Sequence, residues 1–380
     1  MKERLAIFVA TSGHSGVDRV IKNLLQQLAD WEQPVDLLRV RRHGPHIEEM
    51  PRGVRPIDLG TAHVNTSLPA LVRYLRRERP AALLTDKDRV NRIAILARGV
   101  ARVETRLAVR LGTTVSVNLA SRSAFERWQQ RTSIRRLYHL ADCVIVPSQG
   151  AAEDLAAYTG LRRDHVRVIR SPIVTRDLGR RAAEPLDHPW LSDARRPVIV
   201  AVGELGYRKD FETLIRAFAL VRRRRPCRLV ILGRGGLRAK LLGLGAELGV
   251  GEDLDLPGFL PNPHAFMARA DLFVLSSRWE GMPVALVEAL ACHTPVVSTD
   301  CPSGPRELLG EHPVGALVPV GDYRAMADAI DAWLGVQVAE DLFERAIADY
   351  RIEASACAYL KALGMPCPDA LRMTLVRALR

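Results

Sequence analysis

The 380-residue sequence is short of aromatic side chains and of long apolar runs. Aromatic residues make up 5%, and no apolar run approaches the roughly 20 residues that a transmembrane helix needs. The first apolar run, residues 5–10, is followed by Ser12-Gly13-His14, so it indicates a β-strand and not a signal peptide. Few aromatic residues also argue against binding to single-stranded nucleic acid, whose bases stack on aromatic side chains.

Several catalytic and metal-binding patterns are missing as well. The sequence has no G-x-S-x-G elbow and no G-x-x-x-x-G-K-[ST] loop, which argues against an α/β-hydrolase and a P-loop ATPase. Neither the histidines nor the cysteines show a zinc-ligand spacing, and no C-x-x-C is present. The six cysteines are Cys143, Cys227, Cys292, Cys301, Cys357 and Cys367. We expect them to be reduced packing residues, and the protein to be cytoplasmic.

Positive charge is abundant and unevenly placed. The net charge is +12, and residues 1–190 hold 32 Lys and Arg against 20 Asp and Glu, whereas residues 191–380 hold 23 of each kind. A surface of one sign attracts anionic partners, such as an acidic glycan, a lipid pyrophosphate or an anionic membrane leaflet. The alternative is that arginines simply cover solvated helix faces.

Short apolar runs alternate with helical patterns along the whole chain, which is typical of parallel sheets covered by helices on both faces. The expected strands are residues 5–10, 36–40, 81–84, 106–111, 143–147 and 166–169 in the first half, and 198–202, 228–232, 254–256, 272–275, 296–298 and 316–318 in the second. The fold class is therefore α/β, with Rossmann-like domains at residues 1–170 and 197–350 and a linker at 171–196. Residues 351–380 are expected to be helical and to pack back on the first domain.

The densest functional pattern is residues 276–291, SSRWEGMPVALVEALA, directly after an apolar strand. Pro283 suits the first turn of a helix, so Glu280 lies in the turn before it, at the edge of the sheet where ligands bind. A carboxylate there can also be a plain partner of the helix dipole. Glu288 is harder to explain in that way, because it lies in an apolar stretch where a charge needs partners.

The E-x7-E arrangement of Glu280 and Glu288, together with residues 289–299, closely resembles the donor site of family-four retaining glycosyltransferases of the GT-B fold. Shorter matches to the same family are Gly203 with Arg208-Lys209-Asp210-Phe211, Gly233-Arg234-Gly235, Gly258-Phe259 with Asn262-Pro263, and residues 141–148. The resemblance implies two Rossmann-like domains whose parallel sheets face a central cleft.

The resemblance also implies roles for individual residues. Lys209 and Arg208 would neutralise the donor diphosphate, Glu288 would bind the ribose, and Glu280 would bind hydroxyls of the transferred sugar. Lys209, Arg208 and Glu280 are the expected catalytic residues. The expected donor-binding residues are Gly16, Gly203, Arg208, Lys209, Gly233, Arg234, Phe259, Glu280, Gly281, Met282, Pro283, Val284 and Glu288, with backbone N–H groups of Gly281, Met282 and Val284 holding the sugar and the Met282 side chain more suited to packing.

In the first domain, residues 13–20 follow the first strand and open a helix, where N–H groups bind anions. The family has a glycine-containing loop at this place, and the spacing is not the G-x-G-x-x-G of dinucleotide oxidoreductases. Three departures from the family pattern stand out. Gly112-Thr113-Thr114 replaces a frequent histidine loop, Glu204 replaces a basic residue, and His293 replaces a glycine.

The expected function is transfer of a hexosyl-type sugar from a UDP- or GDP-sugar, with retention, to a glycan or lipid-linked acceptor in surface polysaccharide or glycolipid synthesis. No metal or other cofactor is expected, although Asp86-Lys87-Asp88 matches the D-x-D metal signature of a different glycosyltransferase fold. The expected partners are the nucleotide sugar, a glycan or lipid-linked acceptor that can be anionic, and the inner face of the membrane, but no nucleic acid. Two alternatives stay open, a nucleotide-sugar 2-epimerase and a non-catalytic sugar-nucleotide-binding scaffold.

Overall fold

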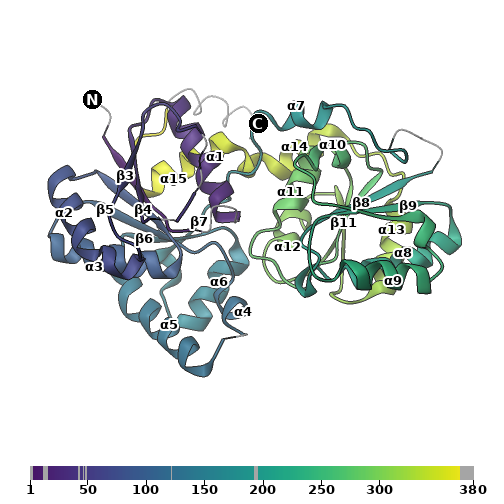
Figure 1. Ribbon diagram of the computed structural model, residues 1–380, viewed down its shortest axis with the longest axis horizontal. Helices are drawn as coiled ribbons and strands as arrows, with labels where there is room; N and C mark the ends of the chain where they lie inside the picture. The colour runs from purple at the N-terminus through teal and green to yellow at the C-terminus, as the bar shows by residue number, and fades with distance from the viewer. Residues whose placement is uncertain are drawn as a thin grey trace. The chain divides into compact units, whose positions relative to one another are not determined.

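The computed structural model describes residues 3–11, 16–41, 43–45, 47, 49–120, 122–191 and 196–368. The chain divides into two compact units (Figure 1). Unit 1 consists of Met1–Ile173 and Tyr350–Arg380, and unit 2 of Val174–Asp349. The sequence-based boundaries were residues 170 and 350. Within the described residues, no helix combines the length and the apolar character needed to cross a lipid bilayer.

Unit 1 is built on a seven-stranded sheet in the order β3-β2-β1-β4-β5-β6-β7, with every neighbouring pair parallel. The strands are β1 (Leu5–Phe8), β2 (Val35–Arg39), β3 (Val54–Asp58), β4 (Ala82–Asp86), β5 (Arg106–Arg110), β6 (Cys143–Val146) and β7 (Val166–Val168). The helices are α1 (Gly16–Asp30), α2 (Leu68–Glu78), α3 (Asp88–Ala101), α4 (Val115–Leu119), α5 (Ala124–Leu137), α6 (Gln149–Thr159) and α15 (Ile352–Ala362), with single 3-10 turns η1 (Val64–Ser67), η2 (Tyr138–Leu140) and η3 (Arg163–His165).

Unit 2 repeats this plan with a six-stranded parallel sheet in the order β10-β9-β8-β11-β12-β13. Its strands are β8 (Val198–Val202), β9 (Arg228–Leu232), β10 (Leu254–Gly258), β11 (Leu272–Leu275), β12 (Val296–Thr299) and β13 (Gly315–Val318). Its helices are α7 (Leu178–Ala183), α8 (Phe211–Arg224), α9 (Arg238–Glu247), α10 (His264–Met267), α11 (Val284–Ala291), α12 (Pro305–Leu309), α13 (Tyr323–Trp333) and α14 (Glu340–Ile347), with η4 (Tyr207–Lys209), η5 (Gly251–Asp253) and η6 (Ala348–Tyr350, whose last residue belongs to unit 1) as 3-10 turns. Two sheets of this kind confirm the expected α/β fold of two Rossmann-like domains.

Strand β3 is absent from the strands expected from the sequence. It pairs in register with β2, from Val54 opposite Val35 to Asp58 opposite Arg39. Only Val54 of the strand is buried, so the segment lacks the alternation of apolar and polar residues that is typical of a strand. Pro56 also cannot donate a ladder hydrogen bond, which is unusual inside a sheet. Proline is tolerated here because β3 is the edge strand, with one side free of ladder partners.

Asp36 of β2 fastens this edge of the sheet. Its buried carboxylate accepts hydrogen bonds from Arg55 of β3, from the hydroxyl of Tyr74 in α2 and from Arg4, with donor–acceptor distances of 2.7 to 2.9 Å. Burial alone would raise the pKa of Asp36. The hydrogen bonds, that of Arg55 first, outweigh it and leave the pKa below its ordinary value.

Helix α15 returns the chain to unit 1 and lies against α1. Tyr359 and Leu360 are almost fully buried in the core formed with strands β1 and β4. The Tyr359 hydroxyl accepts a hydrogen bond of 2.8 Å from Arg110 Nε, and the hydroxyl of Ser355 donates to the carbonyl of Arg170 at 2.6 Å. The C-terminal segment is therefore part of the core of unit 1.

The expected linker contains helix α7, which packs on α10 of unit 2. Arg181 donates to the carbonyl of Pro261 at 2.9 Å, and Asn262 donates to the carbonyl of Arg181 at 2.8 Å. Within the expected linker at 171–196, unit 2 thus begins at Val174. A single buried leucine, Leu178, is too weak a pattern to reveal so short a helix.

The prediction that all six cysteines are reduced was also wrong. Cys357 and Cys367 form a disulfide, with 5.2 Å between their Cα atoms. Gly364, with a φ of 70°, reverses the chain after α15 and brings the two cysteines together. The other four cysteines are free, and burial raises the pKa of Cys143 to about 11 and that of Cys301 to about 12. The cysteines therefore give no support to a cytoplasmic location.

Candidate functional site

The predicted donor residues of unit 2 gather where its strands end. The loops after β8 and β11 carry Arg208, Lys209 and Glu280, and those after β9 and β10 carry Arg234 and Phe259. Strands β8 and β11 are neighbours, and the strand order reverses between them. In open parallel sheets such a reversal leaves a crevice at the carboxyl ends of the strands, which is the usual ligand site.

Glu280 is the centre of a charged cluster. Its Oε2 lies 2.6 Å from Nη1 of Arg208, and its Oε1 lies 2.7 Å from Nζ of Lys209. The hydroxyl of Ser277 donates a further hydrogen bond of 2.7 Å to Oε1. Glu280 is 4% exposed and Lys209 8% exposed, so each buried charge is stable because the other compensates it.

The loop after β8 and the loop after β11 are joined by two hydrogen bonds to main-chain carbonyls and by one ion pair. The hydroxyl of Ser276 donates to the carbonyl of Lys209 at 2.7 Å, and the N–H of Arg278 donates to the carbonyl of Arg208 at 2.8 Å. Arg278 also pairs with Asp210 at 3.0 Å. These contacts fix the positions of the two cations relative to Glu280.

Glycines make this close approach possible. A Cβ atom at Gly203 would lie 2.7 Å from Cε of Lys209, so the glycine leaves room for the lysine stem. A Cβ atom at Gly233 would overlap the carbonyl oxygen of Gly203, and Gly233 has a φ of 149° that other residues rarely adopt. Gly203 and Gly233 thus allow the loops near Lys209 to pack closely.

Arg234 and Phe259 stand together on the surface beside these glycines. The guanidinium of Arg234 lies over the ring of Phe259, 5.1 Å from its centroid, and the ring is 57% exposed. An exposed aromatic ring with a cation on one face is a stacking platform for a planar group.

Glu288 has a partner that the sequence analysis did not identify. Its Oε1 lies 3.2 Å from Nε2 of His264 in α10, and both side chains are about 95% buried. The carbonyl of His264 accepts from Cys292 Sγ, and burial together with Glu288 raises the pKa of the Cys292 thiol to about 12. His264 follows Asn262-Pro263 as an isolated histidine, so no spacing pattern could point to it.

The start of α11 differs from its prediction. Pro283 is the N-cap, so the helix begins at Val284, one residue later than expected. The N–H of Val284 donates to the carbonyl of Met282 at 2.9 Å, so this expected sugar-binding group is already engaged. The carbonyl of Gly281 accepts from the hydroxyl of Ser303 at 3.3 Å. The turn is therefore held by one backbone hydrogen bond of its own and by the Ser303 side chain.

Gly16 is the one predicted donor residue in unit 1, where it is the first residue of α1 and has open space around it. The first part of the predicted loop, residues 13–15 with His14, lies outside the described residues.

The carboxylates of Asp86 and Asp88 each have protein partners. Asp86 is buried in an ion pair with Arg110, and Asp88 pairs with Arg92 and accepts from Tyr138. Among the described residues, no three His, Cys, Asp or Glu side chains form a group able to hold a metal ion.

Comparisons with known proteins identify relatives of both units. The model "Glycosyltransferase Family 4" matches residues 14–177, and "Glycosyl transferases group 1" matches residues 184–347. The chain is 31% identical over 341 residues to the N-acetylgalactosamine-N,N'-diacetylbacillosaminyl-diphospho-undecaprenol 4-alpha-N-acetylgalactosaminyltransferase of Campylobacter jejuni, covering 87% of this chain and 90% of the relative.

Further relatives extend the same pattern. The lipopolysaccharide core biosynthesis glycosyltransferase LpsE of Rhizobium meliloti is 28% identical over 365 residues, which is 92% of this chain and 95% of LpsE. Among solved structures, Anabaena Alr3699/HepE in complex with UDP superposes with a TM-score of 0.77 at 19% identity, over 96% of this chain and all of HepE. The two Rossmann-like units are those of the GT-B fold.

Proposed function

Since this chain belongs to glycosyltransferase family 4, we propose that it transfers a hexosyl-type sugar from a UDP- or GDP-sugar to a glycan or lipid-linked acceptor, with retention at the anomeric carbon. The names of its relatives support a role in surface polysaccharide or glycolipid synthesis, because one acts on a diphospho-undecaprenol-linked sugar and another on the lipopolysaccharide core. HepE, which shares the fold, was solved with UDP.

One observation carries the proposal: two cations, Arg208 and Lys209, converge on the Glu280 carboxylate in the loops that follow the neighbouring strands β8 and β11. A donor diphosphate presents anionic oxygens. The two cations already bind oxygens of this kind, those of the Glu280 carboxylate. In the proposed reaction the diphosphate competes with Glu280 for Arg208 and Lys209, and Glu280 is released to accept hydrogen bonds from the sugar. The cations then stabilise the charge that develops on the leaving diphosphate.

The proposed step exchanges one bond at the anomeric carbon. The bond to the diphosphate oxygen breaks, the acceptor hydroxyl oxygen bonds to the same face, and the hydroxyl proton passes to the leaving phosphate oxygen. The product is the glycosylated acceptor and UDP or GDP. This route requires no protein base, which suits a chain with Gly112-Thr113-Thr114 where relatives often have a histidine.

The other donor contacts are also proposals. Glu288, held by His264, would bind the ribose, and Phe259 with Arg234 would cover the base. The remaining proposed donor-binding residues are Gly16, Gly203, Gly233, Gly281, Met282 and Pro283, together with Val284, whose N–H would have to leave the carbonyl of Met282 to reach the sugar. We further propose that the reaction needs no metal ion, and that the protein works peripherally at the cytoplasmic face of a membrane, where a lipid-linked acceptor would lie.

A thermal-shift panel of UDP, GDP, ADP and their sugars tests the proposed donor. One nucleotide class should raise the melting temperature in proportion to its occupancy of the site, and the matching nucleotide sugar should release free UDP or GDP slowly in water. Nucleotide-sugar binding without release of UDP or GDP would indicate a scaffold. Consumption of the donor that needs no acceptor and releases no free sugar would indicate an epimerase. If no nucleotide binds, the proposal fails.

A further inference from the structure

The positive charge of the chain is concentrated in one segment of unit 1. Residues 65–137 contain 16 Lys and Arg but five Asp and Glu, a net charge of +11 out of the +12 of the whole chain. This segment includes α2, α3 and α5. The three helices alone hold ten Lys and Arg against three Asp and Glu, so most of the excess lies on them.

Helix α5 exposes large apolar side chains that are costly to leave in water. Ile134 is its single buried residue, while Phe125 is 67% and Trp128 62% exposed. Their rings lie side by side with centroids 6.0 Å apart. A capping box between Ser123 and Glu126 fixes the start of the helix, so the two rings are presented by an ordered element.

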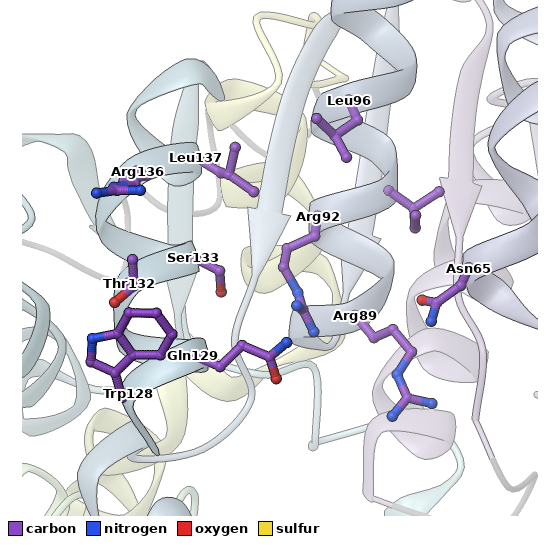
Figure 2. A pocket seen from close by; sticks show the side chains of 11 residues that line it. Asn65, Arg89, Arg92, Leu96, Trp128, Gln129, Thr132, Ser133, Arg136 and Leu137 are labelled. Carbon is purple, nitrogen blue, oxygen red and sulfur yellow. The ribbon is translucent and has the colours of Figure 1, made fainter. Parts of the chain in front are cut away.

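Helix α3 continues the apolar surface. Leu96 and Val100 are 43% and 54% exposed and lie one turn apart on the same face. On one side of them a cavity of about 450 Å³ opens toward Trp128 and Arg136 of α5, and Arg89 and Leu96 line its other wall (Figure 2). On the other side a cavity of about 670 Å³ lies between Val100 and Arg73 of α2.

Arginines that line these cavities include unpaired ones. Among the described residues, no carboxylate lies within ion-pair distance of Arg73 or Arg136, whereas Arg92 pairs with Asp88 at 3.1 Å and Asp88 also attracts Arg89. Arginine guanidinium groups match the geometry of phosphate oxygens. The surface thus combines unpaired cations with exposed tryptophan and aliphatic side chains.

We propose that this surface, the α3–α5 face, formed by Leu96, Val100, Phe125, Trp128, Arg89 and Arg136, docks on an anionic lipid bilayer. The inference rests on the proposed function, because an enzyme that acts on a lipid-linked acceptor must contact the membrane. The surface defined here is the one that makes this contact. Trp128 and Phe125 enter the headgroup boundary, as aromatic side chains do at membrane interfaces, and the arginines bind lipid phosphates. Charge complementarity selects an anionic bilayer over a neutral one.

Co-sedimentation with vesicles tests the proposal, using the full chain and phosphatidylcholine vesicles with or without 30% phosphatidylglycerol. The protein should bind the anionic vesicles, and 0.5 M NaCl should weaken the binding. Phe125→Ala with Trp128→Ala should lower the partition coefficient about tenfold. Reversing two charges with Arg89→Glu and Arg136→Glu should lower it at least about 25-fold, since one basic residue near an anionic surface contributes roughly fivefold.

Matched variants in unit 2 separate this surface from bulk charge and bulk hydrophobicity. Arg216→Glu with Arg223→Glu makes the same charge change on the exposed face of α8, and Val320→Ser with Val336→Ser removes exposed apolar side chains. Neither should change vesicle binding more than twofold. Equal loss in both charge-reversal pairs, or equal binding to neutral vesicles, would overturn the proposal. All variants should keep the wild-type melting temperature, because the substituted side chains are exposed.

Two further measurements show which proposal is wrong if the results conflict. A single-stranded oligonucleotide that binds while the anionic vesicles do not would assign the surface to nucleic acid and overturn the proposal. The UDP- or GDP-induced shift in melting temperature is measured on the same preparations. Vesicle binding without a nucleotide shift would reject the proposed function and keep the membrane surface, and the reverse result would reject the surface alone.

Discussion

The ammonium of Lys209 and the carboxylate of Glu280 form a buried ion pair, with 2.7 Å between Nζ and Oε1. The two residues are 71 positions apart and come from loops after neighbouring strands. Because Arg208 occupies the other carboxylate oxygen, both cations already hold an anion before any donor binds. Under the proposed function, Glu280 would compete with the donor diphosphate while it keeps the two cations in position.

Replacement of Lys209 by alanine should lower the rate of sugar transfer about 100- to 1000-fold, because one cation that stabilises the leaving diphosphate is lost. The fold should persist, since Arg208 and Ser277 still bond to Glu280. UDP or GDP release measures the rate. Lys240→Ala is the control, because Lys240 is an exposed lysine of the same unit that pairs with Glu212. Full activity in Lys209→Ala would refute the assigned role.

Glu280→Gln should separate diphosphate binding from catalysis. Removing the carboxylate charge frees Arg208 and Lys209, so the affinity for UDP or GDP should rise about fivefold. Sugar transfer should fall about 100-fold, because the proposed bonds to the sugar weaken. Calorimetric titration and a turnover assay give the two quantities, with Glu247→Gln on the exposed face of α9 as the control. Weaker nucleotide binding with unchanged turnover would contradict this account.

Glu288→Gln should weaken donor affinity about tenfold, the value of one hydrogen bond to a charged group. The glutamine keeps an oxygen near Nε2 of His264, so the melting temperature should change little. Glu288→Ala should instead destabilise unit 2 by about 2 kcal/mol, because it leaves the buried histidine without this partner. Equal donor affinity for wild type and Glu288→Gln would show that the residue is structural.

Acid should weaken unit 1 through Asp36. Its pKa is lowered in the folded protein, so it stabilises the fold above the unfolded pKa of about 3.9, and this stabilisation is lost as the pH falls through the folded pKa. Asp36→Asn should cost roughly 2 kcal/mol at pH 6 and flatten the pH dependence below about pH 4. Urea unfolding between pH 3 and 6 measures both effects. A parallel curve for wild type and variant would exclude Asp36 as the cause.

Chelation of divalent metals should leave the transfer rate unchanged within about twofold, since Arg208 and Lys209 supply the positive charge that a metal supplies elsewhere. The assay compares protein treated with EDTA and the same protein after addition of Mg²⁺ or Mn²⁺. Loss of activity on chelation that either metal restores would show that the reaction is metal-dependent.

Much of the fold was predictable from the sequence because central parallel strands are buried on both faces. Residues 198–202 form one continuous apolar run, and the structure has β8 at the same residues. Edge strand β3 and short helix α7 bury one hydrophobic side chain each, so no period could reveal them. The disulfide of Cys357 and Cys367 depends on the turn at Gly364, which a search for C-x-x-C spacing does not detect.

The site was predictable in its residue types but not in its partners. The position of Glu280 between an apolar strand and Pro283 placed it at the edge of the sheet. Its pairing with Arg208 and Lys209 depends on how two loops meet, and the contact between Glu288 and His264 depends on how α10 packs on α11. Side-chain contacts between segments distant in sequence leave no local pattern.

The chain returns to unit 1 at Tyr350, and this sets the order in which the two units are completed during translation. Unit 2 is one continuous stretch, inserted between Ile173 and Tyr350, whose backbones are joined by a hydrogen bond of 3.0 Å. A ribosome that has translated residue 349 has therefore delivered all of unit 2, while unit 1 still waits for α15 and for the hydroxyl that Arg110 binds. The half of the molecule that starts first is completed last, and a nascent chain stalled before α15 would expose the apolar groove that this helix fills.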